Sequence, residues 1–276
     1  MPFQISPAIP IIIDGRRLKG QQGTYENTVS TLVQKLCAKS RVGKAIIDEI
    51  VTTSMRGRES TFVTIEPQEA PTIEVISIGP EKREGWNDVG GYFGVKFGGL
   101  LPENRYKPSQ ITNPQSARIL FSPGFGARAR RVVPGAWASM DDESSLLHEL
   151  FHAVRLLQGK SETGKPLSQK QQVDAFQDRE ELYATIVQNI YRSEQGIHSL
   201  RIDYNNNAVA GNYLSGRKIA DEYNFEMSAL VWTMCRFAHT VGQIQCKYNP
   251  IRDYIQKNPT AVEFQEAHRG RCESFK

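Results

Sequence analysis

The sequence is poor in cysteine and has no long apolar run, and both absences exclude classes of protein. Its 276 residues include four cysteines, which are scattered and form no C-x-x-C pair. A disulfide framework, a zinc ribbon and a thioredoxin-type motif are therefore unsupported. No apolar stretch approaches the roughly 20 residues of a transmembrane helix, so we expect no membrane association. Free thiols, as in a protein of a reducing compartment, are the expected state of the cysteines.

The sequence also lacks a strong net charge and a secretory signal. Lys and Arg number 34 against 30 Asp and Glu, a formal charge of +4, which gives no reason to expect nucleic-acid binding. The N-terminal residues carry no basic segment, and the apolar stretch 11–13 ends at Asp14. We therefore expect no cleavable secretory signal, while export by another route stays open. A hydrophobic fraction of 39% and a charged fraction of 23% are typical of a globular protein.

Periodicity predicts strands mainly in the first half of the chain and helices in the second. Residues 1–24 are expected to form a strand or an extended arm. Two alternating segments separated by a turn indicate strands at 61–65 and 72–78, paired as a hairpin. Shorter strands are expected at 92–97 and 117–121. We expect helices at five places: 25 to about 53 with a break capped by Ser40, then about 142–158, 179–194, 220–240 and 251–257.

This order of elements favours an α+β fold. No repeat, low-complexity tract or linker interrupts the chain, so we expect one domain over residues 1–276. Within it, catalytic helices at about 141–205 would lie between an N-terminal part, about 1–140, and a C-terminal helical part, about 206–276.

A short motif in the helix predicted at 142–158 carries the chemistry. His148, Glu149 and His152 form an H-E-x-x-H sequence flanked by apolar residues at helical spacing. Residues four apart lie on one face of a helix, so both imidazoles can bind the same zinc ion. Glu149 projects beside them and can take a proton from a zinc-bound water and pass it to a leaving amine. The alternative is an ordinary amphipathic helix that carries two histidines.

A zinc site of this type needs a third protein ligand and an open position for water. The best candidates are Glu180 and Glu181, at the start of the helix predicted at 179–194. Helical periodicity leans toward Glu180, which lies nearer the apolar side of that helix, whereas Glu181 shares a more polar stripe with Thr185. From the residues alone, both glutamates stay open.

Segments 147–153, 180–184, 189–194 and 200–204 resemble the NleD-like bacterial effector metallopeptidases, a group of gluzincins. In the similar clostridial neurotoxin light chains the third ligand is the second glutamate of an E-E-L sequence. In the anthrax lethal factor family it precedes two aromatic residues and an alanine. Both registers match Glu181, so the resemblance implies that His148, His152 and Glu181 bind one zinc ion per chain. Glu180 and Thr185 are then candidates for contacting those ligands, with a surface position as the alternative for Glu180.

The resemblance also suggests which residues stabilise the transition state. Arg201 and Tyr204 form an R-x-x-Y sequence, similar to the Arg/Tyr pair of the neurotoxin light chains, and such donors stabilise the oxyanion of peptide hydrolysis. In the neurotoxins this pair lies much further beyond the glutamate ligand. A structural arginine and a surface tyrosine are the alternative.

Features that would bind a substrate are few. Arg128, Arg130 and Arg131 form a basic cluster that either attracts an acidic segment or is simply solvated. The irregular segment 79–115 would shape a cleft or a lid. We expect the strand at 117–121 to be the sheet edge along which an extended peptide aligns.

Together these features predict a zinc-dependent endopeptidase with a zincin-like α+β fold. The resemblance implies a bacterial effector or toxin that is made without a conventional signal peptide, is delivered to a host or target cell and cleaves a protein there. Two alternatives stay open: a catalytically inactive zincin-like binding protein, and a zinc hydrolase of a non-peptide amide.

Overall fold

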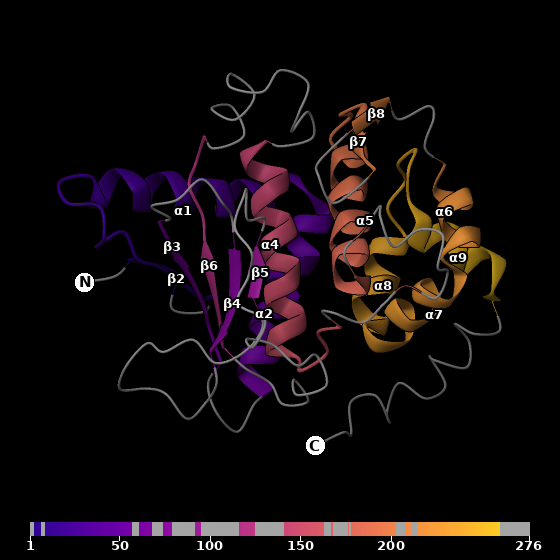
Figure 1. Cartoon of the computed structure of the whole chain (residues 1–276), viewed down its shortest axis with the longest axis horizontal. Coiled ribbons are helices and arrows are strands. Elements are labelled where there is room, and N and C mark those ends of the chain that lie inside the picture. The colour runs from indigo at the N-terminus through magenta and orange to yellow at the C-terminus, as the bar shows by residue number, and fades with distance from the viewer. Residues whose placement is uncertain are drawn as a thin grey trace.

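The protein is an α+β molecule in which a mixed sheet forms one layer and helices pack beside it (Figure 1). The computed structural model describes residues 3–6, 9–56, 61–67, 74–78, 92–94, 116–124, 141–162, 167, 176, 178–202, 208–210 and 215–259. The strands are β1 (Phe3–Ser6), β2 (Ile9–Ile13), β3 (Val63–Glu66), β4 (Glu74–Ile78), β5 (Tyr92–Gly94), β6 (Ser116–Leu120), β7 (Ser199–Arg201) and β8 (Ala208–Ala210). The helices are α1 (Gln22–Lys39), α2 (Arg41–Arg56), α4 (Asp142–Leu157), α5 (Arg179–Glu194), α6 (Gly216–Glu222), α7 (Asn224–Thr233), α8 (Cys235–Gly242) and α9 (Pro250–Lys257).

The larger sheet has the strand order β1-β2-β3-β6-β4-β5. Strands β2, β3 and β6 run parallel, whereas β1, β4 and β5 are antiparallel to their neighbours. The middle of this sheet is apolar, with Ile13, Val63, Ile65 and Ile119 fully buried. Such a run of β-branched residues suits strands that are covered on both faces.

Two expectations for the sheet are wrong. The strands at 61–65 and 72–78 do not form a hairpin, because β6 lies between β3 and β4 and pairs with both. For the same reason β6 is an internal strand, not the edge along which a peptide would align; in the described part of the chain the edges are β1 and β5. A turn signal shows where a strand ends, but the choice of neighbour depends on pairing across the whole sheet.

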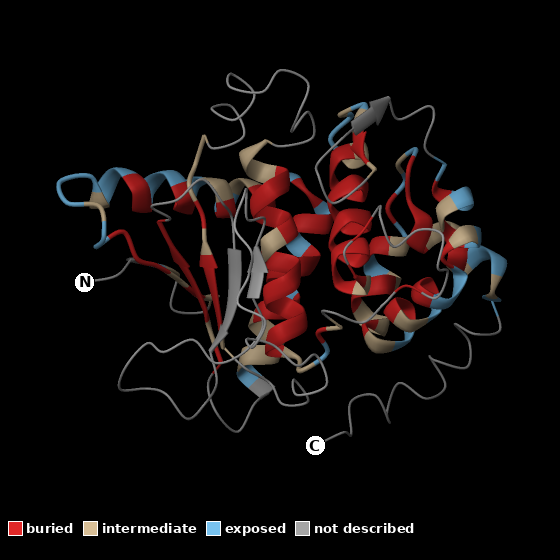
Figure 2. Cartoon of the chain, in the orientation of Figure 1, coloured by how far each residue is buried: buried red, intermediate tan, exposed pale blue. Residues whose placement is uncertain are grey.

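Helix α4 lies between the sheet and α5, and it contacts β6, β4, α1, α2 and α5 (Figure 1). Its start is set locally, because the Asp141 side chain accepts a hydrogen bond from the Ser144 backbone N–H at 2.8 Å. The chain leaves the helix through Gly159, which has a left-handed φ of 64°. Almost every side chain of α4 is buried (Figure 2), so this helix is a core element.

The two N-terminal helices and α5 are joined by a shared cap. Ser40 accepts a hydrogen bond from the Gly43 N–H at 2.9 Å, which confirms it as the cap of α2. The carboxylate of Glu194, the last residue of α5, accepts hydrogen bonds from the Ser40 hydroxyl at 2.7 Å and from the Arg41 N–H at 2.8 Å. An acidic group is favourable at a helix N-terminus, so this contact fixes the end of α5 against the start of α2.

The helix expected at 220–240 is wrong as a single element. Three short helices, α6, α7 and α8, replace it, with breaks at Tyr223 and Met234. Both residues are buried, and neither break is marked by Gly or Pro. Periodicity therefore could not separate the three helices, and the small sheet β7–β8 was also missed.

Within the described ranges, no helix has the length and apolar character needed to cross a membrane. Cys37 and Cys246 are free thiols, as expected. Cys272 lies outside the described residues. Most of segment 79–115 lies outside them as well. Within that segment, β5 occupies the start of the strand expected at 92–97.

Candidate metal centre

Helices α4 and α5 pack side by side and bring the predicted motif residues together (Figure 1). His148 and His152 lie one turn apart on α4, and Glu181 lies in the first turn of α5. The turn that carries Glu181 is set by a local cap, because Asp178 accepts a hydrogen bond from the Glu181 N–H at 3.0 Å. Local caps thus define both helices, and their packing assembles the cluster.

The two histidines and Glu181 form a group of possible metal ligands whose ligand atoms all lie within 4.8 Å of one another. The Nε2 atoms of His148 and His152 are 3.1 Å apart. The carboxylate of Glu181 spans the pair: Oε2 is 3.4 Å from Nε2 of His148, and Oε1 is 3.3 Å from Nε2 of His152. The packing of α5 on α4 therefore brings Glu181 against two histidines that lie about 30 residues earlier in the chain.

Glu149 is less buried than the residues around it on α4. Every other residue from 144 to 157 is buried, whereas Glu149 is half-buried. His148 and His152 are 4% and 1% exposed. The cluster is therefore shielded on most sides, and Glu149 is the residue of this segment most open to solvent.

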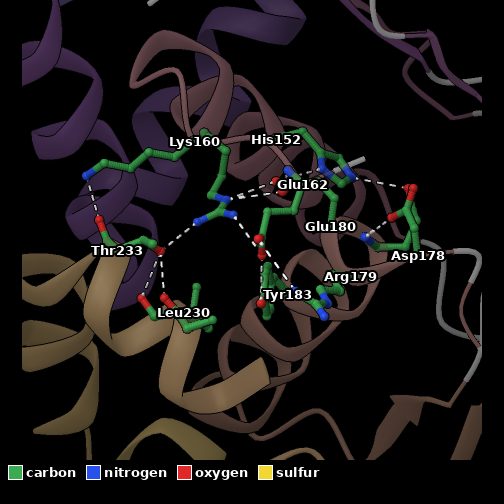
Figure 3. Close-up of polar contacts among 12 residues, drawn as sticks. His152, Lys160, Glu162, Asp178, Arg179, Glu180, Tyr183, Leu230 and Thr233 are labelled. Atoms are coloured by element: carbon green, nitrogen blue, oxygen red, sulfur yellow. Dashed lines mark hydrogen bonds and ion pairs between the residues drawn. The ribbon is translucent and has the colours of Figure 1, made fainter. Parts of the chain in front are cut away.

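Both adjacent glutamates of α5 point inward. Glu180 is fully buried, and its Oε1 lies 3.6 Å from Nδ1 of His152, on the side of the ring opposite the cluster (Figure 3). It also accepts hydrogen bonds from Arg155 Nε at 3.2 Å and from the Glu162 N–H at 2.8 Å. Glu180 therefore contacts His152, one of the predicted metal ligands, and is not a surface acid.

Thr185, the other residue expected to contact a ligand, makes no hydrogen bond to one. Its side chain is buried, and its hydroxyl makes no hydrogen bond in the part of the chain that the structure describes.

Arg201 joins the cluster from β7. It is buried, its Nη1 lies 3.2 Å from Nδ1 of His148, and its Nη2 lies 3.6 Å from Oε2 of Glu181. The Asn189 side chain holds the Arg201 backbone at both polar groups: it donates to the carbonyl at 2.7 Å and accepts from the N–H at 2.8 Å. Helix α5 thus positions Arg201 as well as Glu181. Tyr204, the other half of the predicted pair, lies outside the described residues, as do Arg128, Arg130 and Arg131.

The two histidines differ in their electrostatic surroundings. Burial lowers the pKa of His148 to about 4, and contact with Glu181 only partly opposes this. Burial also opposes a charge on His152, but its contacts with the carboxylates of Glu180 and Glu181 outweigh this effect and raise that pKa to about 10. Burial acts against ionisation of Glu181 too, yet its contacts with the histidines, His148 first, hold its pKa well below the usual range. Without a metal, these surroundings therefore favour the charged form of His152 and the neutral form of His148.

Several residues of the site escaped the sequence analysis. Arg155, Glu162 and Asn189 contact residues of the site. Of the three, only Arg155 stands in a sequence pattern that could have predicted this. It is a charged residue within an otherwise apolar stretch of α4, three residues after His152. Buried charges are almost always paired, so this position could have been identified as part of a polar cluster.

Comparisons of the chain with protein-family models, with curated proteins and with solved structures find no match.

Proposed function

We propose that the protein is a zinc-dependent endopeptidase built on a zincin-like fold. The grouping of these three side chains carries this proposal. A tetrahedral zinc ion with ligand distances of about 2.0–2.1 Å has its ligand atoms about 3.3–3.4 Å apart. The two Nε2 atoms are 3.1 Å apart, one oxygen of Glu181 lies 3.4 Å from Nε2 of His148, and the other lies 3.3 Å from Nε2 of His152. Two imidazoles with one carboxylate are a ligand set of catalytic zinc sites.

The residues around this set supply the other requirements of amide hydrolysis. When bound, zinc acts as a Lewis acid that acidifies water and polarises a carbonyl group. Glu149, half-buried beside the ligands, takes the proton of the attacking water and delivers it to the leaving amine. Arg201 provides a cation next to Glu181, where it supports the negative charge that develops in the transition state.

The biological role is proposed from the resemblance to NleD-like effector metallopeptidases together with this site. The substrate is a protein of a host or target cell, and the enzyme is an effector or toxin delivered into that cell. The helix–helix arrangement supports the resemblance at the third ligand, because Glu181 and not Glu180 groups with the two histidines.

The direct test replaces Glu149 by Gln. The variant should retain zinc, because Glu149 is not one of the ligands, and should lose about 10²–10⁴-fold in cleavage rate, because the proton acceptor is gone. Zinc is measured by elemental analysis, and cleavage by mapping new protein termini in target cells that express either form.

Glu143→Gln is the matched control, since it makes the same chemical change five residues before His148 on α4, at a residue that contacts Lys35 and Tyr191 instead of the ligands. It should cleave like the wild type at 25 °C. Full activity of Glu149→Gln, or a wild-type protein without zinc, would overturn the proposal.

A further inference from the structure

A fully buried arginine lies directly behind the metal centre. Arg155 is 0% exposed and lies on α4, three residues after His152. Burying a guanidinium group away from water is energetically costly, as for any ion, unless good partners replace the solvent. The partners of Arg155 therefore indicate why the charge is there.

Those partners come from three different segments. Nε of Arg155 lies 3.2 Å from each oxygen of Glu180, which belongs to α5. Nη1 donates to the hydroxyl of Thr233 at 3.0 Å, and Nη2 lies 3.8 Å from Oε2 of Glu162. The guanidinium carbon also lies 5.0 Å from the centre of the Tyr183 ring, in cation–π range.

The contact with Thr233 extends the cluster into the C-terminal helices. Thr233 is the last residue of α7, and its hydroxyl donates to the Ala229 carbonyl at 2.8 Å. A hydroxyl that donates one bond keeps lone pairs for another, and Arg155 uses this acceptor (Figure 3). Continuous polar contacts therefore lead from α7 through Arg155 and Glu180 to His152.

Glu180 receives contacts from two sides. Arg155 holds both of its oxygens, and Oε1 also faces Nδ1 of His152. A carboxylate on the outer nitrogen of a ligand histidine sets the ring's orientation and basicity, and losing such a contact typically costs about 10–100-fold in metal affinity. Nε of Arg155 shares its N–H between the two oxygens of Glu180, and this charge-assisted contact holds the carboxylate in that position.

We propose that Arg155 is a positioning residue for the metal centre: it holds Glu180 on His152 and so links the packing of α7 to zinc affinity. The inference rests on the zinc site proposed above. It differs from a purely structural role, in which Arg155 would neutralise Glu180 without affecting the metal.

The test measures zinc affinity by chelator competition in the wild type, Arg155→Lys, Arg155→Met, Glu180→Gln and the double variant Arg155→Met/Glu180→Gln. We expect Arg155→Met and Glu180→Gln each to weaken zinc binding about 10–100-fold. The double variant should match Glu180→Gln to within about twofold, because residues acting through one another are not additive. Arg155→Lys keeps the charge and should fold even if Arg155→Met does not; its loss of affinity should be smaller but measurable.

Arg118→Lys is the control, because Arg118 is also buried and pairs with a buried carboxylate, that of Glu66, in the sheet. It should leave zinc affinity unchanged. The visible spectrum of the cobalt-substituted protein gives a second readout, which should shift in the Arg155 and Glu180 variants and stay unchanged in Arg118→Lys. Wild-type affinity in Arg155→Lys, or additive losses in the double variant, would overturn this inference while leaving the zinc site intact. A wild-type protein that binds no zinc would overturn the proposed function and this inference with it.

Discussion

At the scale of single residues, the site depends on the different roles of two adjacent glutamates. Glu181 contacts Nε2 of both histidines, whereas Glu180 contacts the outer nitrogen of His152. Successive residues of a helix point about 100° apart. Both can face inward here because α5 is buried all round, from Glu180 to Arg192. The structure thus assigns each carboxylate a separate part of the same imidazole cluster.

Replacing these two glutamates should therefore have different effects. Glu181→Ala removes one of three ligands, and we expect the purified protein to lose its zinc, because two histidines alone hold the ion weakly. Glu180→Gln should still bind zinc at saturation, with affinity lower by about 10–100-fold. Zinc content after desalting measures the first effect, and competition with a chelator measures the second. Zinc kept by Glu181→Ala and lost from Glu180→Gln would reverse the assignment.

At the scale of elements, side chains between helices hold the site's framework in place. Glu143 of α4 contacts Lys35 of α1 and accepts a hydrogen bond from the Tyr191 hydroxyl of α5 at 2.6 Å. Burial opposes ionisation of Glu143, but its bonds with Lys35 and Tyr191 outweigh this and lower its pKa. One carboxylate therefore connects three helices and is stabilised in its charged form.

Glu143→Gln should lower the free energy of unfolding at pH 7 by about 0.5–1.5 kcal/mol, the usual net value of a lost hydrogen bond. A lowered pKa in the folded state contributes stability above the unfolded pKa, near the ordinary value of 4.5, and that contribution disappears as the pH falls through the folded pKa. The difference between wild type and variant should therefore narrow below pH 4.5.

Denaturant unfolding at several pH values measures this difference. The control is Asp48→Asn, which changes an exposed pair with Lys44 on α2 and should alter stability by no more than about 0.5 kcal/mol at any pH. A difference between wild type and Glu143→Gln that is the same at pH 7 and pH 4 would contradict the assignment of this carboxylate.

At the scale of the whole molecule, the metal centre belongs to the core. Its ligands come from α4 and α5, and α4 also packs on the sheet and on both N-terminal helices. The ligand atoms converge only when these segments are packed, so the unfolded chain offers no comparable site. If the proposed site binds zinc, that binding is thermodynamically linked to folding.

Zinc should accordingly stabilise the folded protein. At a free zinc concentration of 100 times the dissociation constant, the gain is about 2.7 kcal/mol, and each kcal/mol raises the melting temperature of a protein of this size by roughly 2–4 °C. Thermal melts with zinc and with a chelator measure the shift. Glu149→Gln should show the full shift and Glu181→Ala almost none; an equal shift in Glu181→Ala would place the zinc elsewhere.

Much of the site could be predicted from local sequence. The spacing of His148 and His152 puts them on one helical face regardless of the rest of the fold, and the caps at Asp141 and Asp178 are local as well. Helices α4 and α5 accordingly agree with their predicted bounds to within one residue. Glu181, in contrast, was chosen by resemblance, since periodicity alone leaned toward its neighbour.

What the sequence determined by itself was whatever depends on residues a few positions apart: helices α4 and α5, their caps and the H-E-x-x-H face. Only the tertiary structure decided the place of β6 between β3 and β4, the breaks at Tyr223 and Met234, and the contacts of Arg155 with Glu180 and Thr233. These depend on which distant segments pack together. That choice follows from the burial of the whole chain, because hydrophobic burial is non-directional and does not by itself select a partner.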